Sequence, residues 1–280
     1  MDNYNLIIDL LRKGEYLKTR DLSNQDIPSV LYKYVALDDN KQLNNKKLDC
    51  LRNIDLHSNT IEHFDDKEEY TKLLFSKSEI SKVLQNEIND AKKNDLICCF
   101  TSEKNNPLMW THYANCYKGF LLKFRVDNPQ NILKVVYIDD IGICYINNNI
   151  SDKDKNYLID LNCIIKGKKW EKQKEYRTII NDKEISEFNK NKYKEKGNSQ
   201  NELNFSSNQC GLLLQEVSIG YNCEKENINK IKQISKQRGL PTPKIVYFDK
   251  SFNFNTEIYS EYGLTQEEID FIETNLQEMK

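Results

Sequence analysis

Apolar positions along the chain recur with two different periods, and these predict helices and strands in irregular order. Apolar residues at helical spacing predict helices over residues 4–12, 40–52, 67–93 (one or two helices), 106–114 (after a turn), 152–165, 224–237 and from 265 onward. Short apolar or β-branched runs predict strands over residues 29–35, 54–58, 96–101, 118–124, 133–137, 175–180, 212–219, 244–249 and 254–259. Because no sustained βαβ alternation exists, we expect an α+β fold: a single domain with a mixed, mostly antiparallel sheet flanked by helices.

The same pattern suggests three parts of the chain. We predict an N-terminal helical extension over residues 1–28, an α+β domain over 29–260 and a C-terminal helix over 261–280. A polar insertion is expected at about 182–208, where Asn, Lys, Glu and Ser are frequent and apolar residues are few. The last helix opens with a capping box from Thr265 to Glu268.

Charge and composition exclude several classes of partner. Among the 280 residues, 41 Lys and Arg oppose 43 Asp and Glu, so any binding of nucleic acid or anionic lipid must be local. No apolar run is long enough to span a membrane and the first residues do not begin a signal peptide, which predicts a cytoplasmic protein without a membrane partner. The eight cysteines include no C-x-x-C pair, and Cys98 and Cys99 lie among apolar residues. They predict buried reduced thiols, with no disulfide framework and no metal site.

The common phosphate-binding and hydrolytic motifs are missing. The chain contains no G-x-x-x-x-G-K-[ST], G-x-G-x-x-G, H-E-x-x-H or G-x-S-x-G, and its nine glycines leave little room for a glycine-rich phosphate loop. This argues against P-loop NTPases, Rossmann dehydrogenases, zincins and α/β hydrolases.

The first candidate group is the segment from Met109 to Tyr113, which follows a buried strand. Trp110 and Tyr113 are three residues apart and share a helix face. His112 lies beside them and can carry a proton or donate a hydrogen bond to a phosphate or ribose. The alternative interpretation is that both aromatic residues belong to the core and that His112 is a surface residue.

The second candidate group is the charged segment 168–177. On a strand, Glu175 and Arg177 project from one face, while Tyr176 and Thr178 project from the other. Such a pair can polarise a hydroxyl or bind an anion. The alternative is a solvated charged face with an ordinary salt bridge. A weaker group, His63 to Asp66, is by itself a turn.

These groups resemble, in their order, the bacterial family of unknown function DUF2971, over roughly residues 30–250. The matching stretches are 31–34 (LYKY), 64–67 (FDDK), 109–114 (MWTHYA) with 118–120 (KGF), 170–171 (WE), 175–177 (EYR) and 216–220 (EVSIG). In the motif that runs from Trp170 to Arg177, residues 172–174 separate Glu171 from Glu175. The stretch 64–67 lacks the Asn and Pro of the family's corresponding motif, Phe-Asn-Asp-Pro. The resemblance implies that a shared pattern includes Trp110, His112, Tyr113, Glu175 and Arg177, and it implies no activity.

The first functional hypothesis is a nucleotide- or NAD-acting enzyme with a split, ADP-ribosyltransferase-like sheet, from a bacterial defence or toxin-type system. Lys33, Ser58, Trp110 with Tyr113, and Glu175 occur in the chain order that such enzymes use to hold the ribose, stack the nicotinamide and stabilise a cationic transition state. The expected catalytic residues are Glu175, His112 and Arg177. The expected substrate-binding residues are Lys33, Ser58, Trp110, Tyr113, Lys118 and Asp66. NAD would be a substrate, and no cofactor is identified.

Two alternatives remain open from the sequence. The same residues can bind a small nucleotide or a nucleic acid without turnover, in a sensing or interaction module that works with a partner protein or as a homo-oligomer. A metal-dependent nuclease would instead gather Asp66, Glu171 and Glu175 around Mg²⁺.

Overall fold

A computed structural model describes residues 3–64, 73–75, 79–138, 142–144, 151–180, 202–249, 251–252 and 263–277. Asp66, the strand predicted over 254–259 and most of the predicted insertion lie outside the described residues. The predicted division of the chain into three parts stays a prediction.

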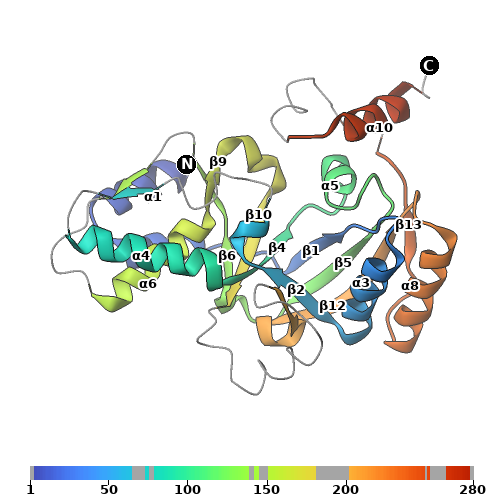
Figure 1. Cartoon of the computed structure of the whole chain (residues 1–280), viewed down its shortest axis with the longest axis horizontal. Helices are drawn as coiled ribbons and strands as arrows, with labels where there is room; N and C mark the ends of the chain where they lie inside the picture. Colours follow the sequence, from blue (N-terminus) through green and yellow to red (C-terminus); the bar gives the residue numbers. More distant parts are fainter. Residues whose placement is uncertain are drawn as a thin grey trace.

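A branched nine-stranded sheet forms the centre of the described part (Figure 1). Its main path runs in the order β11 (Glu202–Ser206), β2 (Asp55–Asn59), β4 (Leu96–Thr101), β1 (Val30–Val35), β5 (Phe120–Val126), β12 (Leu212–Gly220) and β13 (Lys244–Val246). The branch adds β10 (Glu175–Ile180), which pairs with β4 and with β6 (Ile132–Lys134). All these pairings are antiparallel except that of β12 with β13, which confirms the expected α+β fold.

Helices and two small parallel sheets surround this sheet. The helices are α1 (Asn3–Arg12), α2 (Tyr16–Ser23), α3 (Lys41–Asn53), α4 (Glu79–Asn94), α5 (Pro107–His112), α6 (Asp152–Ile164), α8 (Lys225–Gln237) and α10 (Gln266–Gln277), with 3₁₀ turns η1 (Ile61–His63), η2 (Pro129–Asn131), η3 (Lys168–Gln173) and η4 (Ser207–Cys210). The small sheets pair β3 (Leu73–Phe75) with β8 (Gly142–Cys144), and β7 (Val136–Ile138) with β9 (Ile165–Gly167). No helix among the described residues is both long and apolar enough to cross a membrane.

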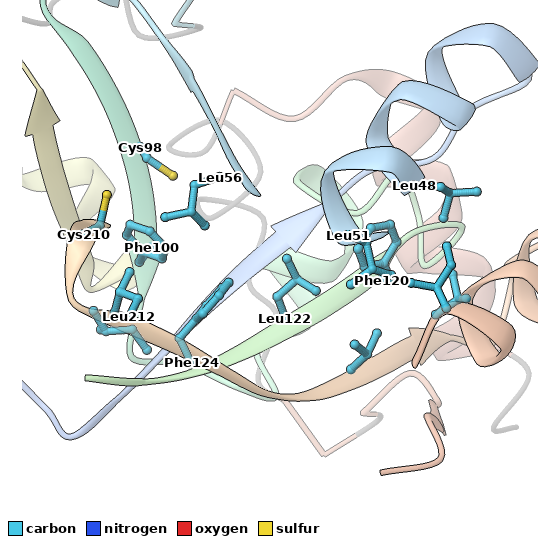
Figure 2. Packing of buried hydrophobic residues seen from close by; sticks show 14 of the residues in the cluster. Leu48, Leu51, Leu56, Cys98, Phe100, Phe120, Leu122, Phe124, Cys210 and Leu212 are labelled. Carbon is cyan, nitrogen blue, oxygen red and sulfur yellow. The ribbon is translucent and has the colours of Figure 1, made fainter. Parts of the chain in front are cut away.

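One face of the sheet packs against α3 and α8. Leu48 and Leu51 of α3 pack with Phe120 and Leu122 of β5 in a continuous apolar cluster (Figure 2). Helix α3 begins where the side chain of Asn40 accepts hydrogen bonds from two backbone amides of the first turn, which satisfies donors that a helix start leaves open.

The opposite face of the sheet carries two separate apolar clusters. One lies under α1, α2, α4 and α6 and reaches Ile97 and Cys99 of β4. The other surrounds the fully buried Trp110 and includes α5, α10 and the outer side of β1. The boundary between the two clusters lies over β4 and β10, and the candidate site is found there.

Most predicted elements are confirmed within a few residues, and three need correction. The region 67–93 contains the strand β3 as well as helix α4, because residues 73–75 find a distant partner in β8. The strand predicted over 133–137 is two strands in different sheets, because β6 pairs with β10 whereas β7 pairs with β9. Helix α5 has six residues and ends at His112, two residues before the end of the predicted range 106–114.

Smaller differences concern polar segments. Helix α2 lies within the predicted helical extension, beyond the one helix predicted there over residues 4–12. Strand β13 ends at Val246, three residues before the predicted end. At the end of the expected insertion, residues 202–206 form β11 on β2, and Phe205 is buried, so the sheet resumes earlier than predicted.

Two local predictions are confirmed in detail. At α10, the backbone amide of Glu268 donates to the Thr265 hydroxyl and the backbone amide of Thr265 donates to the Glu268 carboxylate, which is the predicted capping box. Cys98 is buried and Cys99 half-buried in β4, and both are free thiols.

Candidate functional site

A cavity of about 200 Å³ lies between the two clusters on the second face of the sheet, bordered by β1, β4, η3, β10 and α5. Its lining is largely aromatic, with a smaller set of polar groups and two sulfur-containing residues. The aromatic residues are Tyr32, Tyr34, Phe64, Phe100, Tyr113 and Trp170. The others are Lys33, His63, Thr101, Lys166, Gln173, Glu175, Cys99 and Met109.

A buried chain of charge-assisted hydrogen bonds forms the polar side of this cavity. One carboxylate oxygen of Glu175 accepts from Lys166 Nζ at 3.1 Å, and the other accepts from Arg177 Nε at 2.7 Å. Lys166 also donates to the Gln173 side-chain oxygen at 3.0 Å, and Gln173 Nε2 donates to the Tyr113 hydroxyl at 2.6 Å. These bonds fix the orientation of the Gln173 amide, because its oxygen faces the donor-only ammonium group of Lys166.

The surroundings displace the pKa values of Glu175 and of the neighbouring Cys99 in opposite directions. Burial alone would raise the pKa of Glu175, but the adjacent Arg177 and Lys166 outweigh it and hold that pKa well below its usual value. Glu175 is therefore a carboxylate at neutral pH and cannot serve as a proton donor. Burial, together with the charge of Glu175, raises the pKa of Cys99 well above its usual value, so its thiol stays protonated.

Two loops that carry the site are connected by side-chain to backbone hydrogen bonds. The Thr101 hydroxyl donates to the carbonyl of Gln173 at 2.6 Å, and Asn106 Nδ2 donates to the carbonyl of Lys172 at 3.2 Å. The oxygen of the same Asn106 side chain caps α5 by accepting from the amide of Leu108 at 3.0 Å. Asn106 thus ties the start of α5 to the η3 segment, and both carry residues that line the cavity.

A strained turn follows α5. Asn115, Cys116 and Tyr117 have consecutive φ values of 48°, 52° and 63°, a left-handed conformation that costs roughly 1–2 kcal/mol per non-glycine residue. The turn stacks the Tyr117 ring on Trp110, with 5.1 Å between ring centroids. A side chain at Gly220 would overlap the carbonyl oxygen of Tyr117, which explains glycine at this position.

Three of the predicted site residues line the cavity: Glu175, Tyr113 and Lys33. Strands β1 and β2 pair with the same edge of β4, β1 at Thr101 and β2 at Ile97, and they diverge between these two points. Lys33 of β1 lies at this divergence, and its Nζ donates to the carbonyl of Cys99 at 3.3 Å. The sheet is therefore split at this point, and the lysine bonds a carbonyl that lies between the two pairings of that edge.

Two further predicted residues lie one side chain away from the cavity. Arg177 is fully buried behind Glu175, where it also bonds the Cys163 carbonyl and lies over the ring of Phe64. Trp110 packs edge-on against Tyr34 at 5.2 Å, so it supports the wall without lining the cavity. The stacking of a ligand ring on Trp110, which the sequence predicts, is therefore not available in this cavity.

The remaining predicted residues are not brought to this cavity. His112 contacts the Tyr113 ring, and its Nδ1 lies 3.0 Å from the Glu268 carboxylate of α10. Lys118 lines a second cavity of about 440 Å³ beside α10. Ser58 is buried on β2 opposite Leu203 of β11, and Asp66 lies outside the described residues.

Sequence reasoning missed Lys166 and Gln173. Lys166 interrupts the apolar run from Cys163 to Gly167, and a single lysine in such a run is a signal that could have marked a buried cation. Gln173 carries no comparable signal. Its role depends on contacts with Lys166 and with Tyr113, which is sixty residues distant in the chain.

The polar groups of the cavity are better suited to hydrogen bonding than to binding a metal ion. Among the described residues, no group of three or more His, Cys, Asp or Glu side chains has the geometry to hold a metal ion. Glu171 is exposed on η3, and both oxygens of Glu175 bond cationic side chains that a metal would have to displace.

Residues 109–178 match the model of the family described as "Protein of unknown function (DUF2971)", which confirms the predicted resemblance over this segment. The segment extends from Met109 in α5 to Thr178 in β10 and includes both long motifs. Comparison with curated proteins and with solved structures finds no match.

Proposed function

We propose that the cavity binds one flat ring of a nucleotide-type ligand, with NAD among the candidates. The observation that carries this proposal is an aromatic cavity with a preorganised polar side formed by Lys166, Gln173 and Glu175. Its volume of about 200 Å³ exceeds the roughly 150 Å³ cavity that takes up benzene and is below the 300–1,000 Å³ of pockets for drug-sized molecules. It therefore suits a base or nicotinamide ring, with the rest of the ligand outside.

The charge arrangement favours binding without turnover. A carboxylate that stabilises a cationic transition state acts through its negative charge, and Lys166 and Arg177 both lie within 3.1 Å of Glu175 and offset that charge. The pair is better suited to recognising the donor and acceptor groups of a ring or ribose. A sensing or interaction module is thus the function that we favour, and the reduced buried thiols suit a cytoplasmic site of action.

A transferase or glycohydrolase acting on NAD is the second candidate. It is supported by an ionised carboxylate near the start of a sheet strand, beside a split in that sheet, and this resembles the ADP-ribosyltransferase arrangement by analogy only. On this reading Glu175 would bond the ribose, and no step would use it as a proton donor.

Calorimetric titration with NAD, ATP, adenosine and nicotinamide tests the proposal, with product mass measured in parallel. We expect saturable binding of at least one of these compounds and a loss of affinity of about tenfold or more in Gln173→Leu, which keeps side-chain size and removes two hydrogen bonds. His112→Gln, outside the cavity lining, is the matched control and should bind as the wild type. Failure of all four ligands to bind contradicts the proposal, and appearance of a product would favour the enzyme.

A further inference from the structure

Positive charge is concentrated in two stretches of the chain. Residues 38–53 and 224–244 together hold ten Lys or Arg and five Asp or Glu, a net charge of +5 in a chain whose net charge is −2. Helix α10 has the opposite character, with four acidic residues and no Lys or Arg. The charge is thus distributed unevenly over the molecule.

The two basic stretches come together in the fold. Helices α3 and α8 lie side by side on the same face of the sheet (Figure 1), and they are linked by the Lys41–Glu226 pair at 3.7 Å and the Lys230–Asn45 bond at 3.4 Å. Both helices bury their apolar sides in one cluster, which leaves their polar sides facing solvent. This surface lies on the face of the sheet opposite to the aromatic cavity.

Five cations of this surface are exposed and form no ion pair within the described part of the chain. They are Lys46, Lys225, Lys232, Lys236 and Arg238, called here the basic face. In contrast, Lys47 pairs with Asp38 at 3.4 Å and Lys230 pairs with Glu226 at 2.8 Å. The basic face therefore keeps its charge available for an external partner.

The cations on α8 form a single stripe. Lys225, Lys232 and Lys236 are separated by seven and four residues, which places them within a sector of about 40° around a helix of 3.6 residues per turn. At 1.5 Å per residue the stripe is about 16 Å long, and duplex DNA presents one phosphate charge per roughly 1.7 Å of its axis. A row of this length faces several phosphates at once.

We propose that the basic face binds the sugar-phosphate backbone of nucleic acid, without reading its sequence. An anionic membrane is the less suitable partner, because a helix that binds lipid needs an exposed apolar side. On α8 the apolar residues Ile231 and Ile234 are buried, and Leu43 is the one large exposed hydrophobic residue of the two fully described helices. Contacts with phosphate groups do not require an exposed apolar side on the helix.

The proposal is tested by fluorescence anisotropy with labelled short duplex DNA and single-stranded RNA at two salt concentrations. Five phosphate contacts predict that affinity for duplex DNA falls by about 500-fold between about 50 and about 200 mM salt. The variant Lys232→Gln/Lys236→Gln/Arg238→Gln should weaken binding at low salt and reduce the slope of log affinity against log salt by more than half. The control Lys93→Gln/Lys134→Gln/Lys153→Gln removes the same charge from exposed positions on α4, β6 and α6 and should leave the slope unchanged.

The proposal would be overturned if neither nucleic acid bound at low salt, or if both triple variants lost the same nucleic-acid affinity. Binding to phosphatidylserine vesicles in place of nucleic acid would also overturn it. The outcome is separable from the function proposed for the cavity. Gln173→Leu should not change nucleic-acid affinity, since Gln173 lies on the other face of the sheet.

Discussion

Replacing Glu175 by glutamine should destabilise the protein far more than replacing an ordinary surface carboxylate. The side chains of Glu175, Lys166 and Arg177 are 7%, 6% and 0% exposed, so the substitution removes two buried ion pairs at once. Removing one partner of a buried pair costs about 3–5 kcal/mol, against about 0–1 kcal/mol for an exposed pair. We expect a loss of this larger size in the free energy of unfolding, measured by urea denaturation at pH 7.

Acid titration adds a second signature of the same group. The folded pKa of Glu175 is depressed, whereas an unfolded glutamate titrates near about 4.3. The contribution of Glu175 to the free energy of unfolding is therefore fully present at pH values above the unfolded pKa, and it is lost as the pH falls toward the folded pKa. Below about pH 4.3, this one group should add a slope of up to about 1.4 kcal/mol per pH unit, and Glu175→Gln should lack it.

Glu216→Gln provides the matched control for this prediction. Glu216 also bonds two cations, Lys123 at 3.5 Å and Lys104 at 3.7 Å, but its side chain is 21% exposed and the pairs are long. It should lose about 0–1 kcal/mol. If the two variants lose equal stability and show equal acid slopes, the buried charge chain does not stabilise the fold as argued.

Three other changes test the structure around the site. Gly220→Ala should cost at least about 3 kcal/mol in thermal or urea unfolding, because its methyl group meets the Tyr117 carbonyl, whereas Gly239→Ala has open space and should cost only the left-handed backbone penalty of about 1–2 kcal/mol. Equal losses would contradict the close approach. Asn106→Ala should cost about 1–2 kcal/mol through loss of the α5 cap, and an unchanged unfolding midpoint would refute that role. Mass analysis after brief treatment with iodoacetamide should show modification at Cys50 before Cys98, and the reverse order would contradict the burial of Cys98.

Local periodicity predicted those parts of the site that depend on one element. The alternation of a strand placed Glu175 and Arg177 on one face of β10, and the structure bonds them at 2.7 Å. Burial of that pair was not predictable from local charge, since the segment 168–177 has the composition of a solvated surface. It follows from long-range packing, because α6 and β9 bring the Cys163 carbonyl and Lys166 onto the same face.

Of the site residues predicted from their order along the chain, some line the cavity and others do not. Lys33 lines the cavity because β1 lies beside β4, but Ser58 lies on β2 outside the cavity lining, on a strand paired with β11. His112 follows Trp110 by two positions, which turns its side chain toward α10 and Glu268. Chain order alone does not determine which strand edges and helix faces enclose a cavity, because this depends on the pairing of distant strands.

The central claim, that the cavity encloses a ligand ring, is tested most directly by tryptophan fluorescence. The chain has two tryptophans, of which Trp170 lines the cavity and Trp110 packs behind Tyr34. Titration with NAD, adenosine or nicotinamide should change the emission of the wild-type protein saturably, and this change should be lost in Trp170→Phe, where only Trp110 reports. Emission that stays constant with all three compounds, or a saturable change that persists unchanged in Trp170→Phe, would contradict the account.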